Sequence, residues 1–166
     1  MKRLLFTFGT LYPDDIISAL LGVVPTNFYA TLTGYSIYKG TFEHLPSKVA
    51  DFFLTRNIDK RTFSYLFAKQ DTDHGFVIEG RAYEISLEQE LILDHWERYP
   101  DWYRKQSVNI KSKDGAMHEA FIYTLDIDGE RLSEYKRVMN DPDKVLANAK
   151  ATRQGVMEKF PRIFSK

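Results

Sequence analysis

The chain has 166 residues, the usual size of one domain, and its content of 43% hydrophobic and 28% charged residues is ordinary for a globular protein. Lys and Arg together number 23, as do Asp and Glu, so the net charge offers no steering toward nucleic acid, an anionic membrane or an acidic substrate. The absence of cysteine excludes disulfides, thiolate catalysis and cysteine-ligated zinc. We therefore expect one compact cytoplasmic domain that binds neither nucleic acid nor membrane.

The chain begins with a predicted strand, a glycine turn and a helix. Apolar residues over 4–8 predict a strand buried largely on both faces, and Gly9 ends it. Pro13 and the two aspartates after it provide helix-start chemistry, and Gly22 is placed to end the helix over 16–21. Five further segments bounded by turn-forming residues predict strands: 32–38, 62–68, 76–85, 106–110 and 117–125. Six strands imply a sheet or a barrel.

Three later segments predict helices. Residues 46–54 have an apolar side and follow the second strand. Ser86 and Gln89 form a capping box for a helix that Pro100 prevents from continuing past the preceding tyrosine. Asp141 and the proline after it begin a C-terminal helix with apolar residues at helical spacing, which we expect to dock on the sheet.

Motifs for several common chemistries are missing. The chain has no glycine-rich dinucleotide or P-loop motif and no G-x-S-x-G nucleophile elbow. Its four histidines are scattered without metal-ligand spacing: His44, His74, His95 and His118. We therefore expect neither a metal site nor a cofactor.

Glu97 is the leading candidate for chemistry. It lies in the last turn of the capped helix, where the negative end of the helix dipole disfavours a carboxylate. Helical spacing aligns it with Leu93 and Glu90, and partial burial there would raise its pKa toward the range of a general base. A solvated glutamate paired with Arg98 or a nearby lysine is the alternative, and position alone leaves both interpretations open.

The turn formed by Phe8, Gly9, Thr10 and Leu11 is the second candidate. A glycine turn between a buried strand and a helix exposes backbone N–H groups that can hold a carboxylate or an oxyanion. An ordinary tight turn would have the same residues, so this pattern alone is not decisive.

Four segments in order resemble the γ-glutamylcyclotransferase-like family, including its avirulence-induced plant branch and the γ-glutamylamine cyclotransferases. The family's turn Tyr-Gly-[Ser/Thr]-[Leu/Asn] corresponds to residues 8–11, and its second strand Gly-Tyr-x-Leu-Tyr corresponds to residues 34–38. The pattern Val-x-Gly-x-x-Tyr-x-[Val/Ile] corresponds to residues 78–85. The helix signature Leu-Asp-x-x-Glu followed by Tyr-x-[Arg/Lys] corresponds to residues 93–97 and 103–105.

This resemblance implies an α+β fold, a small mixed β-barrel with flanking helices. It implies a core domain over 1–125 with an insertion at about 41–61, and we expect residues 126–166 to be a helical extension packed on that core. The implied reaction is cofactor-independent: the α-amine of a γ-glutamyl group attacks its own side-chain amide, releasing 5-oxoproline and a free amine or amino acid. Glu97 would be the general base.

The same resemblance implies how the substrate is held. Backbone N–H groups of Gly9, Thr10 and Leu11 would bind the glutamyl carboxylate or the oxyanion, and Tyr103 and Tyr123 would line the cavity. Phe8 replaces the usual tyrosine of the turn, so any hydrogen bond from that hydroxyl is lost.

Two alternatives keep the fold. One is a non-catalytic relative that binds a small molecule or a protein, and the other is an enzyme that cleaves a γ-glutamylated biosynthetic intermediate. The sequence does not decide the leaving amine or the oligomeric state.

Overall fold

The computed structural model describes residues 2–73, 76–135 and 141–165. The strands are β1 (Lys2–Thr7), β2 (Asn27–Thr41), β3 (Ser64–Gln70), β4 (Phe76–Ser86), β5 (Arg104–Ser112), β6 (Met117–Thr124) and β7 (Glu130–Arg131). The helices are α1 (Asp14–Leu21), η1 (Phe42–His44), α2 (Ser47–Leu54), α3 (Leu87–Trp96), α4 (Pro142–Lys159) and α5 (Pro161–Phe164).

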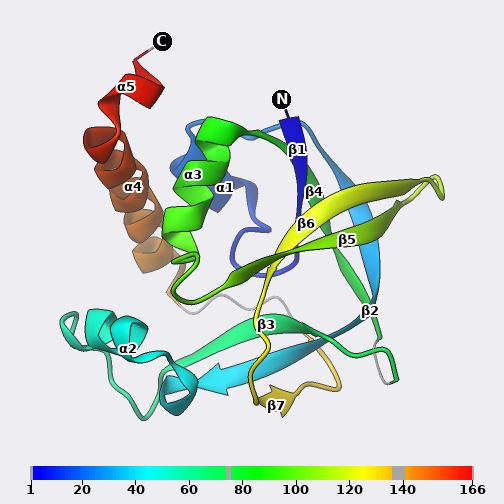
Figure 1. Cartoon of the computed structure of the whole chain (residues 1–166), viewed down its shortest axis with the longest axis horizontal. Coiled ribbons are helices and arrows are strands. Elements are labelled where there is room, and N and C mark those ends of the chain that lie inside the picture. The colour runs from blue at the N-terminus through cyan, green and yellow to red at the C-terminus, as the bar shows by residue number, and fades with distance from the viewer. Residues whose placement is uncertain (1, 74–75, 136–140, 166) are drawn as a thin grey trace.

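The strands form a small mixed barrel, as predicted (Figure 1). Their order is β1-β4-β2-β3-β6-β5, and β7 pairs with β2. Parallel pairing of Leu5 in β1 with Phe121 in β6 and antiparallel pairing of β2 with β5 close the sheet on itself. Helices α1, α3 and α4 lie together on one side of the barrel, and α2 lies below them in the view, near the ends of β2 and β3 (Figure 1).

Two apolar clusters hold these layers together. One fills the barrel and includes Phe6, Phe8 and Ile122. The other lies between the barrel and the helices and includes Leu5 and Phe121. Neighbouring residues of β1 therefore enter different clusters, which confirms the prediction of a strand buried on both faces.

The predicted elements are present, with shifted boundaries. The Ser86–Gln89 capping box and the end of α1 at Gly22 are confirmed, and Gly22 adopts the αL conformation. Strand β2 begins at Asn27, well before the predicted start at residue 32, and its first part is paired with β4. Helix α3 ends at Trp96, before the proline, since Arg98 adopts a left-handed φ of 51°. The two-residue strand β7 was not predicted, and His74 lies outside the described residues.

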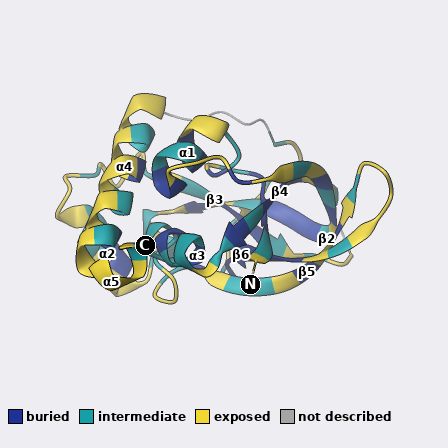
Figure 2. Cartoon of the chain, turned by 90° about the horizontal axis from the view of Figure 1, so that it is seen from above, coloured by how far each residue is buried: buried dark blue, intermediate teal, exposed yellow. Residues whose placement is uncertain are grey.

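Helix α4 packs on α1 and α3. Its buried residues are Ala149 and Val156, and both join the cluster between helices and barrel. The outward side of α4 is exposed (Figure 2). The domain boundary at residue 125 remains a prediction.

Gly80 provides a test of barrel packing. A Cβ added there would overlap the carbonyl oxygen of Thr7 and lie 2.6 Å from Phe6 Cζ. We expect Gly80→Ala to lower the free energy of unfolding, measured in urea, by about 1–3 kcal/mol through overpacking. Gly155→Ala is the matched control, because that helical glycine has no atom within 4 Å of an added Cβ. The control should stabilise the protein by up to about 1 kcal/mol; equal effects of the two changes would contradict this account.

Candidate active site

Glu97 caps the C-terminal end of α3. Its backbone N–H donates to the carbonyl of Leu93 at 2.9 Å, which holds the residue at the end of the helix. The residue keeps part of its surface exposed, but protein surrounds the carboxyl group, and this burial raises its pKa to about 8. Within the described part of the chain, neither Arg98 nor a lysine pairs with the carboxylate. The site therefore has a proton-binding group that is available to a ligand.

Two tyrosines flank this carboxyl group. The hydroxyl of Tyr103 donates to the Leu66 carbonyl at 2.9 Å, and that of Tyr123 donates to Asp94 Oδ1 at 2.7 Å. Burial raises the pKa of each tyrosine, and the negative charge of Glu97 raises both further. Both hydroxyls therefore stay protonated near Glu97, and both are already used to hold the site together.

A network of ion pairs holds Asp94, the residue that accepts the hydrogen bond of Tyr123. Lys105 Nζ lies 2.8 Å from Asp94 and 2.6 Å from Glu90, and Arg3 lies 2.7 Å from Glu90. Burial acts to lower the pKa of Lys105, but its bonds to Asp94 and Glu90 outweigh this and raise it. This network was not predicted from the sequence. The signal was the four-residue spacing of Glu90 and Asp94, which puts two carboxylates on one helix face.

The turn after β1 presents free backbone donors. Tyr12 N donates to Gly9 O at 2.9 Å, closing the turn. The backbone N–H groups of Gly9, Thr10 and Leu11 have no acceptor among the residues that the structure describes. Free N–H groups on successive residues can bind a carboxylate or an oxyanion.

The turn residues do not all face the same way. Leu11 is buried in the cluster that also contains Tyr103 and Tyr123. Phe8 instead inserts its ring into the barrel, against Tyr135 at 5.8 Å between ring centroids, and Thr10 is exposed. At position 8 the side chain therefore points away from the turn, and only the backbone could contribute to binding.

Two hydroxyls outside the predicted site hold the ends of this turn. Tyr83 on β4 donates to the Tyr12 carbonyl, and Tyr135 donates to the Phe8 carbonyl, each at 3.0 Å. Neither was predicted to support the site. Tyr83 was the tyrosine of the third family pattern, whereas no sequence signal marked Tyr135.

A cavity of about 400 Å³ opens at the ends of β3 and β6. Its lining residues are Lys69, Gln70, Thr72, Gln106, Thr124, Leu125 and Asp126. None of the predicted site residues lines it, although Thr124 directly follows Tyr123. Among the described residues no group of three His, Cys, Asp or Glu could hold a metal ion. In the same residues, no helix has the length and apolar composition that a membrane crossing requires.

The mixed barrel and the helices packed on it define the fold class of this protein. Residues 5–140 match the model described as gamma-glutamyl cyclotransferase, AIG2-like. The chain belongs to this family, and the resemblance found in the sequence is confirmed.

Solved structures support the fold. One described as gamma-glutamyl cyclotransferase has a TM-score of 0.60 at 12% identity, with 98% of this chain and 86% of that chain covered. An uncharacterized human protein has a TM-score of 0.61 at 10% identity, with 88% and 98% covered. A solution structure from Arabidopsis thaliana has a TM-score of 0.52 at 14% identity, with 99% and 91% covered. No match was found among curated proteins. At these identities the likeness establishes the fold alone.

The pKa of Glu97 predicts a pH-dependent cost in stability. The folded-state pKa of about 8 lies above the ordinary value of 4.5, so the folded protein retains a proton that the unfolded chain has released. Wild-type stability should therefore fall as pH rises between these two values. Glu97→Gln has no such proton, so its stability relative to wild type should increase by at least about 1 kcal/mol between about pH 5 and pH 9.

Urea unfolding of both proteins at the two pH values measures this difference. A constant offset between variant and wild type would show that the carboxyl group is not desolvated.

Proposed function

We propose that this protein is a γ-glutamyl cyclotransferase that releases 5-oxoproline and a free amine or amino acid from a γ-glutamyl substrate. The observation that carries the proposal is the desolvated and unpaired carboxyl of Glu97, in a chain of this family. A buried acidic group with no structural partner costs folding free energy, and such groups cluster at functional sites.

The turn after β1 supplies the anion-binding part of the proposed site. The free N–H groups of Gly9, Thr10 and Leu11 would receive the α-carboxylate of the glutamyl group or the developing oxyanion. Tyr83 and Tyr135 fix the two ends of the turn, so these donors need little reorganisation. Because the donors belong to the backbone, the change from tyrosine to Phe8 does not remove them.

The reaction is an internal aminolysis. The nitrogen of the substrate's α-amine attacks the γ-carbonyl carbon, forming the ring C–N bond, and the original amide C–N bond breaks. Glu97 takes the proton that the attacking nitrogen loses and gives it to the leaving nitrogen, so one carboxyl group serves both transfers. No water is consumed and no redox change occurs. Ring-closing geometry provides much of the rate, because both reacting groups belong to one molecule.

The environment of Glu97 suits this role. A pKa of about 8 makes the carboxylate a better base than an exposed glutamate and leaves its acid form able to protonate the leaving nitrogen. Tyr103 and Tyr123 would flank the substrate beside it with hydroxyls that stay protonated.

Release of 5-oxoproline from a panel of γ-glutamyl dipeptides, γ-glutamyl-ε-lysine and glutathione tests the proposal. Wild type should turn over at least one of them, and Glu97→Gln should lower kcat by about 10²- to 10⁴-fold, since it keeps the shape and removes the base. Glu119→Gln, at an exposed position on β6, is the matched control and should retain activity. Absence of product across the panel would favour a binding protein or a dedicated pathway substrate.

The pH dependence of kcat/KM gives a separate test. Catalysis needs the carboxylate form, so kcat/KM should rise with pH and level off with an apparent pKa near the value of about 8 of Glu97. The α-amine of each substrate is titrated separately, so that its own pKa is not assigned to the enzyme. A limb near the ordinary carboxyl pKa of 4.5 would contradict the proposed environment of the base.

A further inference from the structure

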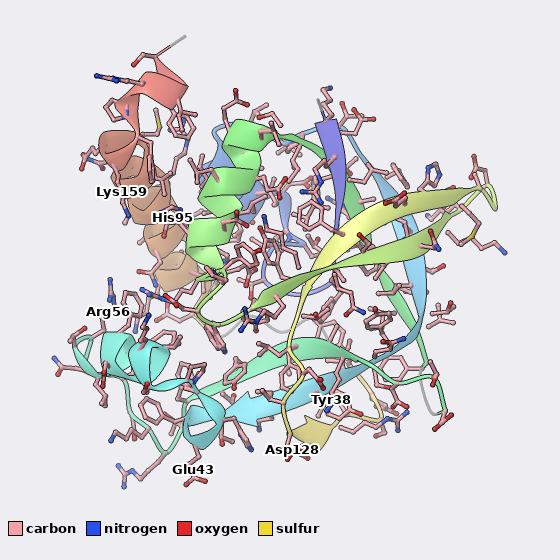
Figure 3. All side chains as sticks on the ribbon, in the orientation of Figure 1. Tyr38, Glu43, Arg56, His95, Asp128 and Lys159 are labelled. Carbon is pink, nitrogen blue, oxygen red and sulfur yellow. The ribbon has the colours of Figure 1, made fainter. Side chains whose placement is uncertain are left out.

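Two carbonyl groups in the turn after β1 are held by hydrogen bonds. The segment between β1 and α1, blue in Figure 3, runs among many side chains in the middle of the view. Tyr135 donates to the Phe8 carbonyl at 3.0 Å, and the N–H of Tyr12 donates to the Gly9 carbonyl at 2.9 Å. The C=O and N–H of one trans peptide unit share a plane and point in opposite directions. The two held carbonyls therefore direct the N–H groups of Gly9 and Thr10 away from these donors.

Tyr12 is the residue on which this arrangement depends. Its N–H closes the turn, and its own carbonyl accepts the hydroxyl of Tyr83 at 3.0 Å. Its ring lies under the guanidinium group of Arg81, whose carbon is 4.9 Å from the ring centroid. A guanidinium over an aromatic face is attracted to the ring electrostatically. Both the backbone and the ring of Tyr12 are thus held by side chains of β4.

Arg81 contacts the turn and the helix that follows it. It is paired in register with Thr7, the last residue of β1, so its side chain starts beside the turn. Its Nη1 pairs with Asp14, the first residue of α1, and lies 3.4 Å from the Tyr83 hydroxyl. One side chain therefore meets the Tyr12 ring, the hydroxyl that holds the Tyr12 carbonyl, and the start of α1.

The electrostatics of Arg81 depend on the same contacts. Hydrogen bonding to Tyr83 raises its pKa, Tyr29 and Asp14 raise it further, and together they outweigh the burial that lowers it. The guanidinium therefore stays charged, and its charge is already paired with Asp14. Arg81 is thus suited to hold the turn in place rather than to offer a free charge to a substrate.

Stability alone does not account for an arginine at this position. The Arg81 side chain is only 16% exposed, and its Nε is buried without an acceptor among the residues that the structure describes. A buried ion pair is weak evidence for stability, and an unsatisfied buried donor lowers the free energy of unfolding. A role in shaping the turn gives a reason for the arginine that its stability contribution does not.

We propose that Arg81 is a positioning residue for the anion-binding turn. By stacking on Tyr12 and pairing with Asp14, it keeps the N–H groups of Gly9 and Thr10 in the orientation that receives the anionic group of the substrate. This inference rests on the proposed function and deepens it, because it assigns the geometry of the turn to a side chain on the neighbouring strand.

Backbone ¹⁵N relaxation of the Gly9 and Thr10 amides tests the positioning without any substrate. In wild type both order parameters should be near the value of about 0.85 of rigid backbone, and Arg81→Met should lower both toward about 0.6. Lys2→Met is the matched control, since it removes a cation paired with Glu84 across the same two strands at the other end of β1. The control should leave the turn amides unchanged.

Kinetics of 5-oxoproline release measure the consequence, with the γ-glutamyl substrate that wild type turns over best. Arg81→Met should lower kcat/KM by about tenfold to a hundredfold, because a small misplacement of binding groups is costly in rate. The apparent pKa of about 8 assigned to Glu97 should stay unchanged, whereas general loosening of the protein would move it toward 4.5 and count against the assigned role. Arg81→Lys keeps the charge without the planar group, so it should recover only part of the loss.

A second variant covers the case in which Arg81→Met does not fold. Tyr12→Leu removes the stacked ring but keeps the N–H and the carbonyl of that residue, and it should have the same effects. Rigid turn amides and full kcat/KM in a folded variant would overturn the inference and leave the cyclotransferase proposal intact. If wild type releases no 5-oxoproline, the cyclotransferase proposal fails, and the relaxation measurement still decides whether Arg81 holds the turn.

Discussion

The irregularity in β2 is the constraint on which the rest of the structure depends. This strand pairs with β4 up to Leu32 and again at Tyr35, with a register shift between these two residues and Gly34 at a φ of 78°. From Tyr35 onward it also pairs with β3. A glycine adopts this backbone region without the steric cost that a side chain would add. One long strand can therefore belong to both halves of the sheet, which allows the sheet to close into a barrel with β3 beside β6.

Closure of the barrel brings together the ends of elements that are distant in sequence. Strand β6 contacts β1 at Phe121 and β3 at Thr124, so the turn after β1 and the start of β5 lie at neighbouring strand ends. Helix α3 is held beside them by the capping box at one end and by the ion pairs of Asp94 and Glu90 along one face. The carboxyl group of Glu97 is buried as a consequence of this arrangement, whereas Asp94 and Glu90 are paired with cations.

The parts of the chain outside the family patterns also contribute to the site. Tyr135 comes from the predicted extension. Its ring packs on the Phe8 ring, and its hydroxyl holds the turn by donating to the Phe8 carbonyl. The insertion contributes Phe53, whose ring packs against Trp102 in the loop after Glu97. The surroundings of the candidate site thus include loop segments, which tolerate change more readily than the strands they connect.

Local chemistry was enough to predict most elements and the two parts of the candidate site. The capping box at Ser86, the glycine at position 22 and the alternation in β1 act within a few residues, so the sequence determined them by itself. The same is true of Glu97 as a carboxyl at a helix end. The sequence could not decide between a solvated glutamate and a buried one, because burial depends on which strands and loops pack over the helix end.

Only the tertiary structure decided the side-chain partners: Lys105 beside Asp94, Tyr83 and Tyr135 on the turn, and Arg81 over the Tyr12 ring. These pairs are far apart along the chain, or lie on a loop without regular periodicity, so no local pattern specifies them.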